Sequence, residues 1–176
     1  MRARMKALGL AICLVYSCRS SPPGDSRRTV RSHPAAPAEP GLAAELQTIA
    51  VDHQLAVNLS EGFSARPVCV GATSPGVTGI PSPFAGDTTD PSEAVLRRLR
   101  SAGHQVFADS ECGGPESNAR RERMTVLVWW PVASGDDAVT MVERRCGWPC
   151  SRGMRVFLHR SGNRWQVVRH EMAGVS

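Results

Sequence analysis

The sequence predicts an α+β fold in which one or two helices pack on a curved, mostly antiparallel sheet of about five to six strands. Residues 42–60 and 91–102 carry apolar side chains at helical spacing. From Arg123 onward the apolar residues instead alternate with a period of two, which is the pattern of β-strands. Helical segments that precede a run of strands are typical of the α+β class, and we expect residues 42–176 to form this one domain.

The N-terminal residues 1–17 have the pattern of a signal peptide. Residues 1–6 hold three cations and no acid, and residues 7–16 form an uncharged, mostly apolar run. A basic segment followed by a short apolar segment is typical of secretion signals. The run is too short to span a membrane, which takes about 20 apolar residues. The sequence therefore predicts an exported chain.

The residues Val15-Tyr16-Ser17-Cys18 resemble the lipobox of bacterial lipoproteins. In that family the cysteine thiol is acylated and the chain is cut directly before it. The resemblance therefore implies that Cys18 is lipidated and that the partner of the mature chain is a membrane of the cell envelope. Arg19 stands where some inner-membrane lipoproteins have aspartate, which favours the outer membrane. The alternative is ordinary secretion, with Cys18 left as a half-cystine.

Residues 18–41 are predicted to be a tether between this cysteine and the domain. The segment contains five prolines among serine, alanine and arginine. Such a composition buries too little apolar surface to fold on its own. At about 3.1 Å per residue in an extended polyproline conformation, the tether would reach roughly 70 Å.

The net charge of +5 does not predict a nucleic-acid partner. Residues 1–17 contribute +3 and residues 18–41 contribute +2, so residues 42–176 are neutral overall. Domains that bind nucleic acid carry excess positive charge. We therefore expect no nucleic acid among the partners of this chain.

The first helix, expected over residues 42–60, includes a histidine in its apolar stripe. His53 is either a buried histidine with one satisfied partner or a catalytic or ligating residue. The stripe consists of Leu42, Leu46, Ile49, Ala50, His53 and Val57.

The central part of the sequence predicts strands at residues 65–71 and 104–109. Between them lie a loop at residues 72–91, rich in glycine and proline, and a helix at residues 91–102 that Gly103 ends. A loop of this length is either functional or disordered, and the composition favours disorder.

The C-terminal part of the sequence predicts a succession of strands. Apolar residues occur on both faces of residues 123–134, which indicates a strand covered on both sides. Three further alternating runs follow at residues 138–146, 152–160 and 164–172.

Two histidines lie on the last two predicted strands. A two-residue turn at residues 162–163 would place His159 opposite Gln166 and His170 opposite Arg155. The two histidines would then share a sheet face about 13 Å apart along the strand, at about 3.3 Å per residue. This separation argues against a shared metal ion, and we assign no metal ligand.

Four cysteines of the predicted domain form an even set, which in an exported chain indicates disulfides. Cys69, Cys112, Cys146 and Cys150 allow three pairings. The last two lie close together between strands and suit a hairpin-closing disulfide, which would leave Cys69 to pair with Cys112. Their Cys-x3-Cys spacing differs from the Cys-x-x-Cys spacing of redox-active sites.

The sequence contains no phosphate-binding Walker loop, no dinucleotide glycine fingerprint and no nucleophile elbow. We therefore assign no cofactor and no catalytic residue, and we expect a protein other than an enzyme. Four arginines near the last cysteines form either a solvated face or a site for an anionic group. They are Arg144, Arg145, Arg152 and Arg155.

The runs "CGWPCSRGMRVFLHRSGNRWQVVRHEMAGVS" and "PSEAVLRRLRSAGHQVFADSEC" are similar to parts of a loose group of small exported bacterial proteins of unknown function. Their helix-then-sheet order is similar to that of the cone-shaped nuclear transport factor 2-like folds, which often enclose a pocket. This resemblance supplies no catalytic residue.

Two functional hypotheses follow for the domain. The first is a non-catalytic accessory or binding domain held at the cell envelope. The second is a small-molecule-binding or enzymatic domain with His53, Trp129 and Trp130 lining a pocket.

Overall fold

The computed structural model describes most of the predicted domain. The predicted signal peptide, Cys18, most of the tether, most of the long loop, and Cys146 and Cys150 lie outside the described residues. The described residues are 35–63, 67–74, 88–113, 124–145 and 151–175 of the 176 in the chain.

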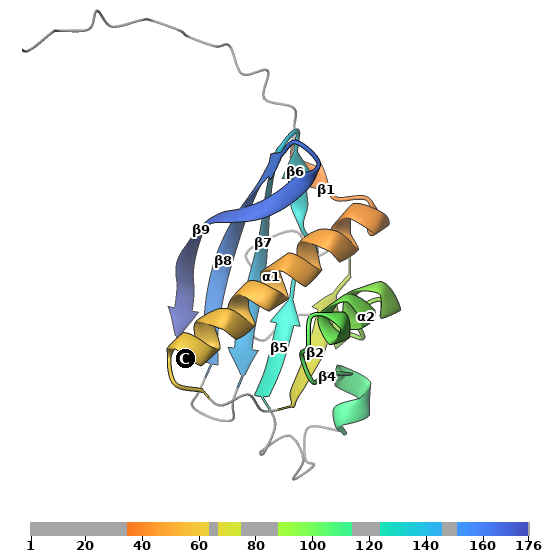
Figure 1. Cartoon of the computed structure of the whole chain (residues 1–176), viewed down its shortest axis with the longest axis vertical. Helices are drawn as coiled ribbons and strands as arrows, with labels where there is room; N and C mark the ends of the chain where they lie inside the picture. The colour runs from red at the N-terminus through yellow and green to blue at the C-terminus, as the bar shows by residue number, and fades with distance from the viewer. Residues whose placement is uncertain (1–34, 64–66, 75–87, 114–123, 146–150, 176) are drawn as a thin grey trace, which may run out of the picture. The chain divides into compact units, whose positions relative to one another are not determined.

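Two α-helices and one short 3₁₀ helix form in the described residues (Figure 1). Helix α1 spans Pro40–Ser60, two residues longer at its start than predicted. The fixed φ of Pro40 and its missing N–H suit the first turn of a helix, where N–H groups have no partner within the helix. Helix α2 spans Glu93–Ser101 and is followed by Gly103 at a φ of 92°. The 3₁₀ helix η1 covers Asp109–Cys112.

Within the described residues, nine strands make one strongly curled sheet, which is larger than the five to six strands that the sequence predicts. Five of the strands are long enough to show a sequence pattern, and the other four have two or three residues each. The strands are β1 (Ala36–Pro37), β2 (Val68–Thr73), β3 (Thr88–Thr89), β4 (Val106–Ala108), β5 (Met124–Val128), β6 (Val132–Ser134), β7 (Asp137–Arg145), β8 (Ser151–Ser161) and β9 (Arg164–Val175).

The main part of the sheet has the order β9-β8-β7-β5-β2-β4. Strand β2 runs parallel to both β4 and β5, whereas the other pairings are antiparallel. The sheet is therefore mixed. The parallel pair β2–β4 is joined through α2, because parallel neighbours need a crossover connection and a helix usually supplies it.

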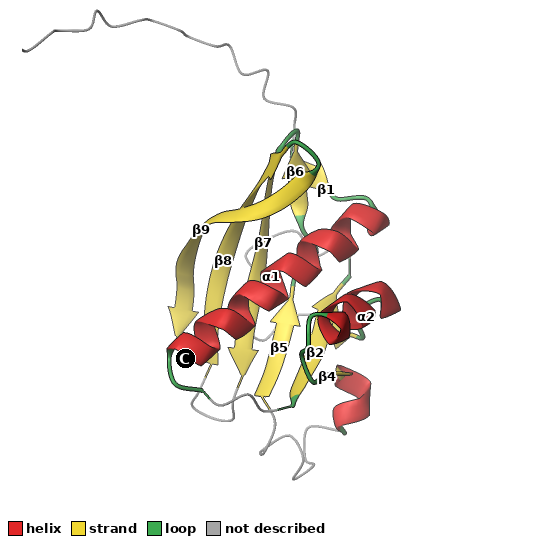
Figure 2. Ribbon diagram, viewed as in Figure 1, coloured by secondary structure: helices red, strands yellow, loops and turns green. Residues whose placement is uncertain are grey.

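Helix α1 lies across the concave side of the sheet, as Figure 2 shows, and packs against β5, β7 and β9. Helix α2 packs against α1 and β4. The inward-facing residues of α2 are Val95, Leu96 and Leu99, which confirms the predicted face of this helix. One hydrophobic core fills the space between the two helices and the sheet.

The buried face of α1 differs from the predicted stripe. Gln47, Gln54 and Asn58 are buried, whereas His53 and Val57 are only partly buried. The buried face is therefore rotated away from the stripe that the apolar residues alone define. The helix can take this orientation because the polar side chains at its C-terminal end find hydrogen-bond partners inside the fold.

All five residues of β5 are buried, which confirms a strand covered on both sides. The predicted continuous run at residues 123–134 is wrong, however, because the chain leaves the strand at Trp129 and resumes as β6. Pro131 stands in this break, and its carbonyl accepts a hydrogen bond of 2.9 Å from the N–H of Ala38. A proline has no N–H to donate to a sheet, which favours such an interruption.

The β8–β9 hairpin forms at the predicted turn, and Gly162 takes a φ of 62° there. His159 lies opposite Gln166 as predicted. His170 lies opposite Val156 and not opposite Arg155, so the predicted register is wrong for this second histidine.

The register changes at a β-bulge in strand β9. Leu158 pairs with Val167 and Phe157 pairs with Arg169, which leaves Val168 as the extra residue. A one-residue shift moves every later side chain to the other face of the sheet. His170 therefore lies on the inner face of the sheet, the face of Val156, and does not share the face of His159.

The second face of β2 and β5 is also tightly packed. A disulfide joins Cys69 of β2 to Cys112 of η1, with the two Cα atoms 6.2 Å apart. This pair is the one that the sequence analysis leaves after pairing the other two cysteines. Next to it, a Cβ atom at Gly71 would lie 2.6 Å from Cδ2 of Leu127. A side chain at position 71 would therefore force Leu127 to move.

We expect Gly71→Ala to lower the free energy of unfolding by about 1–3 kcal/mol, because the buried Leu127 must shift to admit the methyl group. Gly41→Ala is the matched control, since a Cβ there has no neighbour within 4 Å. That change lies in a helix and should stabilise the protein by up to about 1 kcal/mol. Urea unfolding of both variants measures the two effects, and equal stability of Gly71→Ala and wild type would contradict the packing argument.

Candidate functional site

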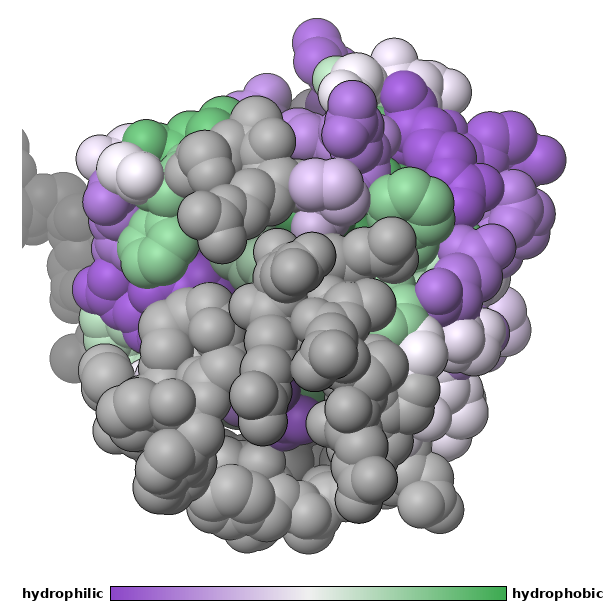
Figure 3. All heavy atoms as spheres, turned by 90° about the horizontal axis from the view of Figure 1, so that it is seen from below, coloured by the Kyte–Doolittle hydropathy of each residue, from purple (hydrophilic) through white to green (hydrophobic). Residues whose placement is uncertain are grey.

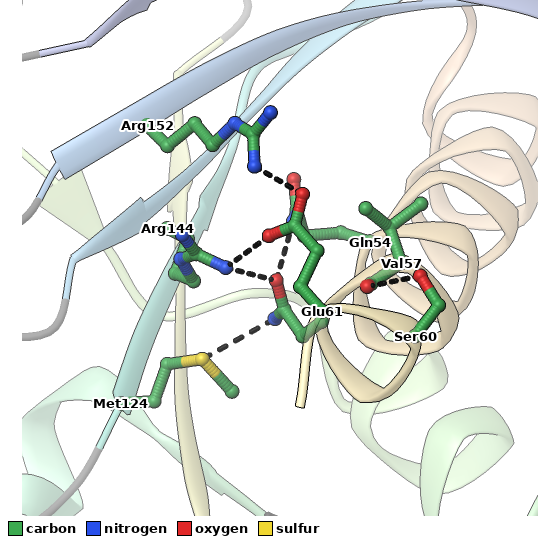
Figure 4. Close-up of polar contacts among 8 residues, drawn as sticks. Gln54, Val57, Ser60, Glu61, Met124, Arg144 and Arg152 are labelled. Atoms are coloured by element: carbon green, nitrogen blue, oxygen red, sulfur yellow. Dashed lines mark hydrogen bonds and ion pairs between the residues drawn. The ribbon is translucent and has the colours of Figure 1, made fainter. Parts of the chain in front are cut away.

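The C-terminal end of α1 is held to the sheet by a cluster of charged and amide side chains (Figure 4). Glu61 follows the last residue of the helix, and its carboxylate contacts two arginines from different strands. Arg144 of β7 lies 2.9 Å from Oε2, and Arg152 of β8 contacts Oε1. One carboxylate therefore joins the helix to two neighbouring strands. We call Gln54, Asn58, Glu61, Arg144 and Arg152 the Glu61 cluster.

The amide groups of the cluster extend this contact into the core. Asn58 Oδ1 accepts hydrogen bonds from Nη1 of Arg144 at 3.0 Å and from Nε2 of Gln54 at 2.7 Å. Its own Nδ2 donates to the sulfur of Met124 at 3.2 Å. Buried amides cost little free energy when they are hydrogen-bonded in this way. The polar residues of the helix are therefore an integral part of the packing.

The guanidinium of Arg144 is the most deeply buried charge of the cluster, with a side chain that is only 6% exposed. Its Cζ lies 4.0 Å from the ring centroid of Phe63, close enough for a cation–π contact. Figure 3 views the lower end of the molecule, where hydrophilic surface predominates among the described residues and apolar areas interrupt it. A buried guanidinium is stable only with a partner for its charge, and Glu61 is that partner.

The two arginines set the protonation state of Glu61. Partial burial raises the pKa of this carboxyl, but the hydrogen bonds and charges of Arg144 and Arg152 outweigh it and bring the pKa below the ordinary 4.5. A carboxylate that stays ionised near neutral pH is a poor general acid. The geometry and the lowered pKa therefore favour a positioning role for Glu61 in the fold.

The remaining two arginines of the predicted anion site also contact acids of the chain. Arg145 donates to the buried carboxylate of Glu143 at 2.8 Å, and Arg155 lies 3.9 Å from Glu171. Each of the four arginines therefore has a carboxylate of this chain as its partner. A free anion would have to compete with these carboxylates.

A second polar group involves residues of α1 that precede Glu61 in the chain, and it contains three histidines. His53 Nε2 lies 3.0 Å from Nδ1 of His170, and the two ring centroids are 5.0 Å apart. The preceding residue, Asp52, contacts a third histidine, with 2.6 Å between its Oδ1 and Nε2 of His104. Two consecutive residues of α1 therefore each bind a histidine from another part of the fold.

The environment of His53 favours the neutral imidazole. Partial burial lowers the pKa of His53, the nearby His170 lowers it further, and the carboxylate of Asp52 opposes these effects. The hydrogen bond between the rings needs one nitrogen as donor and the other as acceptor, so at least one ring is neutral.

The contact of His170 with His53 could not be predicted from the sequence, because the bulge at Val168 leaves no pattern in a single sequence. His159, the other histidine of the hairpin, instead lies 2.8 Å from a carboxylate oxygen of Asp137. The polar positions of α1 did give a signal for the Glu61 cluster. Gln54 and Asn58 are four residues apart, the spacing of neighbours on one helix face.

The three residues of the predicted pocket have separate surroundings. Trp130 packs against the hydrophobic core, and its Nε1 donates to the carbonyl of Ala38 at 2.9 Å. Trp129 is buried outside that core cluster. His53 makes its contact with His170. Of the three residues, His53 contacts a histidine, Trp130 contacts the core and the backbone of Ala38, and Trp129 is buried elsewhere.

No protein-family model, curated protein or solved structure matches this chain. Within the described ranges, the structure has no helix that is both long and apolar enough to cross a membrane. Those ranges also contain no group of three or more histidine, cysteine, aspartate or glutamate side chains arranged to hold a metal ion.

We expect Glu61→Gln to lower the free energy of unfolding at pH 7 by about 2 kcal/mol, because the buried Arg144 loses its charged partner. Glu93→Gln is the matched control: Glu93 is 71% exposed and lies 3.7 Å from Arg100. Removing such a surface pair should change stability by less than about 0.5 kcal/mol.

The effect of Glu61→Gln should also depend on pH. Because the pKa of Glu61 is lowered in the folded state, its ionised form stabilises the fold above the ordinary pKa, and this stabilisation is lost as the pH falls through the folded pKa. Urea unfolding from pH 7 to pH 3 should show the variant and wild type converge in acid. A difference that stays constant over this range would contradict the ion-pair argument.

Proposed function

We propose that the chain is an exported bacterial lipoprotein, anchored to the cell envelope through an acylated Cys18. The observation that carries the proposal is the order of its N-terminal residues: a basic segment, a short apolar run and a cysteine directly after a small residue. The proline-rich tether that follows would hold the domain away from the membrane surface. The outer membrane is the expected location, on the basis of Arg19.

The disulfide of the domain supports export. Thiols of cytosolic proteins stay reduced, whereas disulfides form and persist in exported proteins. The Cys69–Cys112 bond joins a central strand to the 3₁₀ helix and lies within the buried part of the fold. Such a bond belongs in a chain that folds in an oxidising compartment.

We further propose that the domain is a binding or accessory module and not an enzyme. Its buried charged residues, Glu143 and Arg144, are used to hold the fold together: Arg144 pairs with Glu61 at the end of α1, and Glu143 pairs with Arg145. These pairs support a role in which the domain presents a surface at a fixed distance from the membrane.

Intact-mass analysis of the protein in bacterial membranes tests the anchor. We expect the wild-type chain to begin at Cys18, to carry the mass of acyl chains and to fractionate with membranes. Cys18→Ala should lack the acyl mass, whereas Cys13→Ala, five residues earlier in the apolar run, should remain acylated. Separation of inner and outer membranes on a density gradient locates the protein.

The competing outcome is ordinary secretion. A mature wild-type chain without acyl mass, or a Cys18→Ala variant that keeps the same membrane fraction and mass, would contradict the lipoprotein proposal. Peptide mapping of the same sample without reductant would also identify the partners of Cys146 and Cys150.

A further inference from the structure

The histidine pair joins two elements that are far apart in the sequence. His53 lies in α1 and His170 lies in β9, 117 residues later. Both belong to regular secondary structure, which holds side chains in more defined positions than loops do. The bulge at Val168 is what turns His170 toward the inner face, and bulges often re-aim side chains in this way.

The separation of the two ring nitrogens fits ligands of one metal ion. A metal–nitrogen distance of about 2.0–2.1 Å places two nitrogens about 2.9 Å apart in neighbouring positions of a square plane and about 3.3 Å apart in a tetrahedron. The observed distance between His53 Nε2 and His170 Nδ1 is 3.0 Å. An ion could therefore replace the proton of this hydrogen bond at nearly the same nitrogen–nitrogen distance, with the rings turning so that both nitrogens point at it.

The surroundings of the pair suit a cation. Imidazole nitrogens are common ligands of transition-metal ions, and two of them face each other here. Asp52 directly precedes His53 in the chain, and its carboxylate places a negative charge close to the site. His170 is exposed, so an ion has access from solvent.

We propose that His53 and His170 form a binding site for one divalent late transition-metal ion, with Cu²⁺ as the preferred ion and Zn²⁺ and Ni²⁺ as weaker ones. Two imidazoles select these ions over Mg²⁺ and Ca²⁺, which prefer oxygen ligands. The order follows the general order of stability of complexes with nitrogen ligands. The 3.0 Å separation is also closest to the square-planar spacing that Cu²⁺ favours.

The two histidines fill two positions of the ion, and the other positions are open to water or to a ligand from outside. The bound ion would also link α1 to the edge strand β9. An ion that binds the folded state alone stabilises it in proportion to the logarithm of its concentration. The site is thus expected to make the stability of the domain depend on copper. This inference does not depend on how the chain is anchored.

The test uses the full chain, purified without a polyhistidine tag and treated with a chelator, then titrated with copper sulfate, zinc chloride or magnesium chloride. Affinity is measured by calorimetry, and the thermal midpoint is measured with and without each metal. The test variants are His53→Gln and His170→Gln. The matched controls are His104→Gln and His159→Gln, because each of these histidines contacts a carboxylate and, among the described residues, no second histidine.

We expect the wild-type chain and both controls to bind one Cu²⁺ with nitrogen ligands visible in the electron paramagnetic resonance spectrum, and to melt at a higher temperature with Cu²⁺ than without. Changes to residues that only orient a ligand already cost about 10–100-fold in metal affinity. Loss of either ligand should therefore weaken Cu²⁺ binding at least about tenfold. Magnesium should have no effect.

Two results would overturn the proposal. The first is a wild-type chain whose melting temperature and spectrum do not respond to Cu²⁺, which would leave the pair as a hydrogen bond alone. The second is equal Cu²⁺ binding by wild type, His53→Gln and His170→Gln, which would place the ion elsewhere. Far-UV circular dichroism checks the fold of each variant, and the exposed His170 carries the test if His53→Gln does not fold.

Discussion

The contact between the end of α1 and the guanidinium of Arg144 is the constraint on which the rest of the structure depends. A buried charge must be paired, and both of its hydrogen-bonding partners, Asn58 and Glu61, come from one end of the helix. This requirement fixes the rotation of α1 over the sheet. It also sets which face of α1 meets the core, and where His53 lies relative to the edge strand.

The parts of the fold that follow from local patterns could be predicted from the sequence. The face of α2 follows from Val95, Leu96 and Leu99, which lie three and four residues apart around one side of a helix. The turn at Gly162 follows from the preference of tight hairpins for glycine at positive φ. In both places neighbours in the sequence decide the structure, so a single chain carries the information.

The parts that depend on distant contacts could not be predicted in the same way. The polar residues of α1 are buried because Arg144, more than eighty residues later, supplies the partner of Asn58. Strand β2 takes parallel neighbours on both sides, although its residues show only that it is buried. The histidine pair needs both the rotation of α1 and the bulge in β9, and neither is visible as a period in the sequence.

The bulge at Val168 has a consequence for recognising the same site in other chains. Trp165 and His170 both lie on the inner face, although they are five positions apart and an odd separation places two residues of a regular strand on opposite faces. A related sequence that lost the bulge residue would form a regular strand in which the histidine stands four positions after the tryptophan, still on the inner face and opposite the same residue of β8. A sequence that kept every residue but paired without the bulge would instead turn this histidine to the outer face. The register of the last strand, and not the number of residues between the tryptophan and the histidine, therefore decides whether the pair forms.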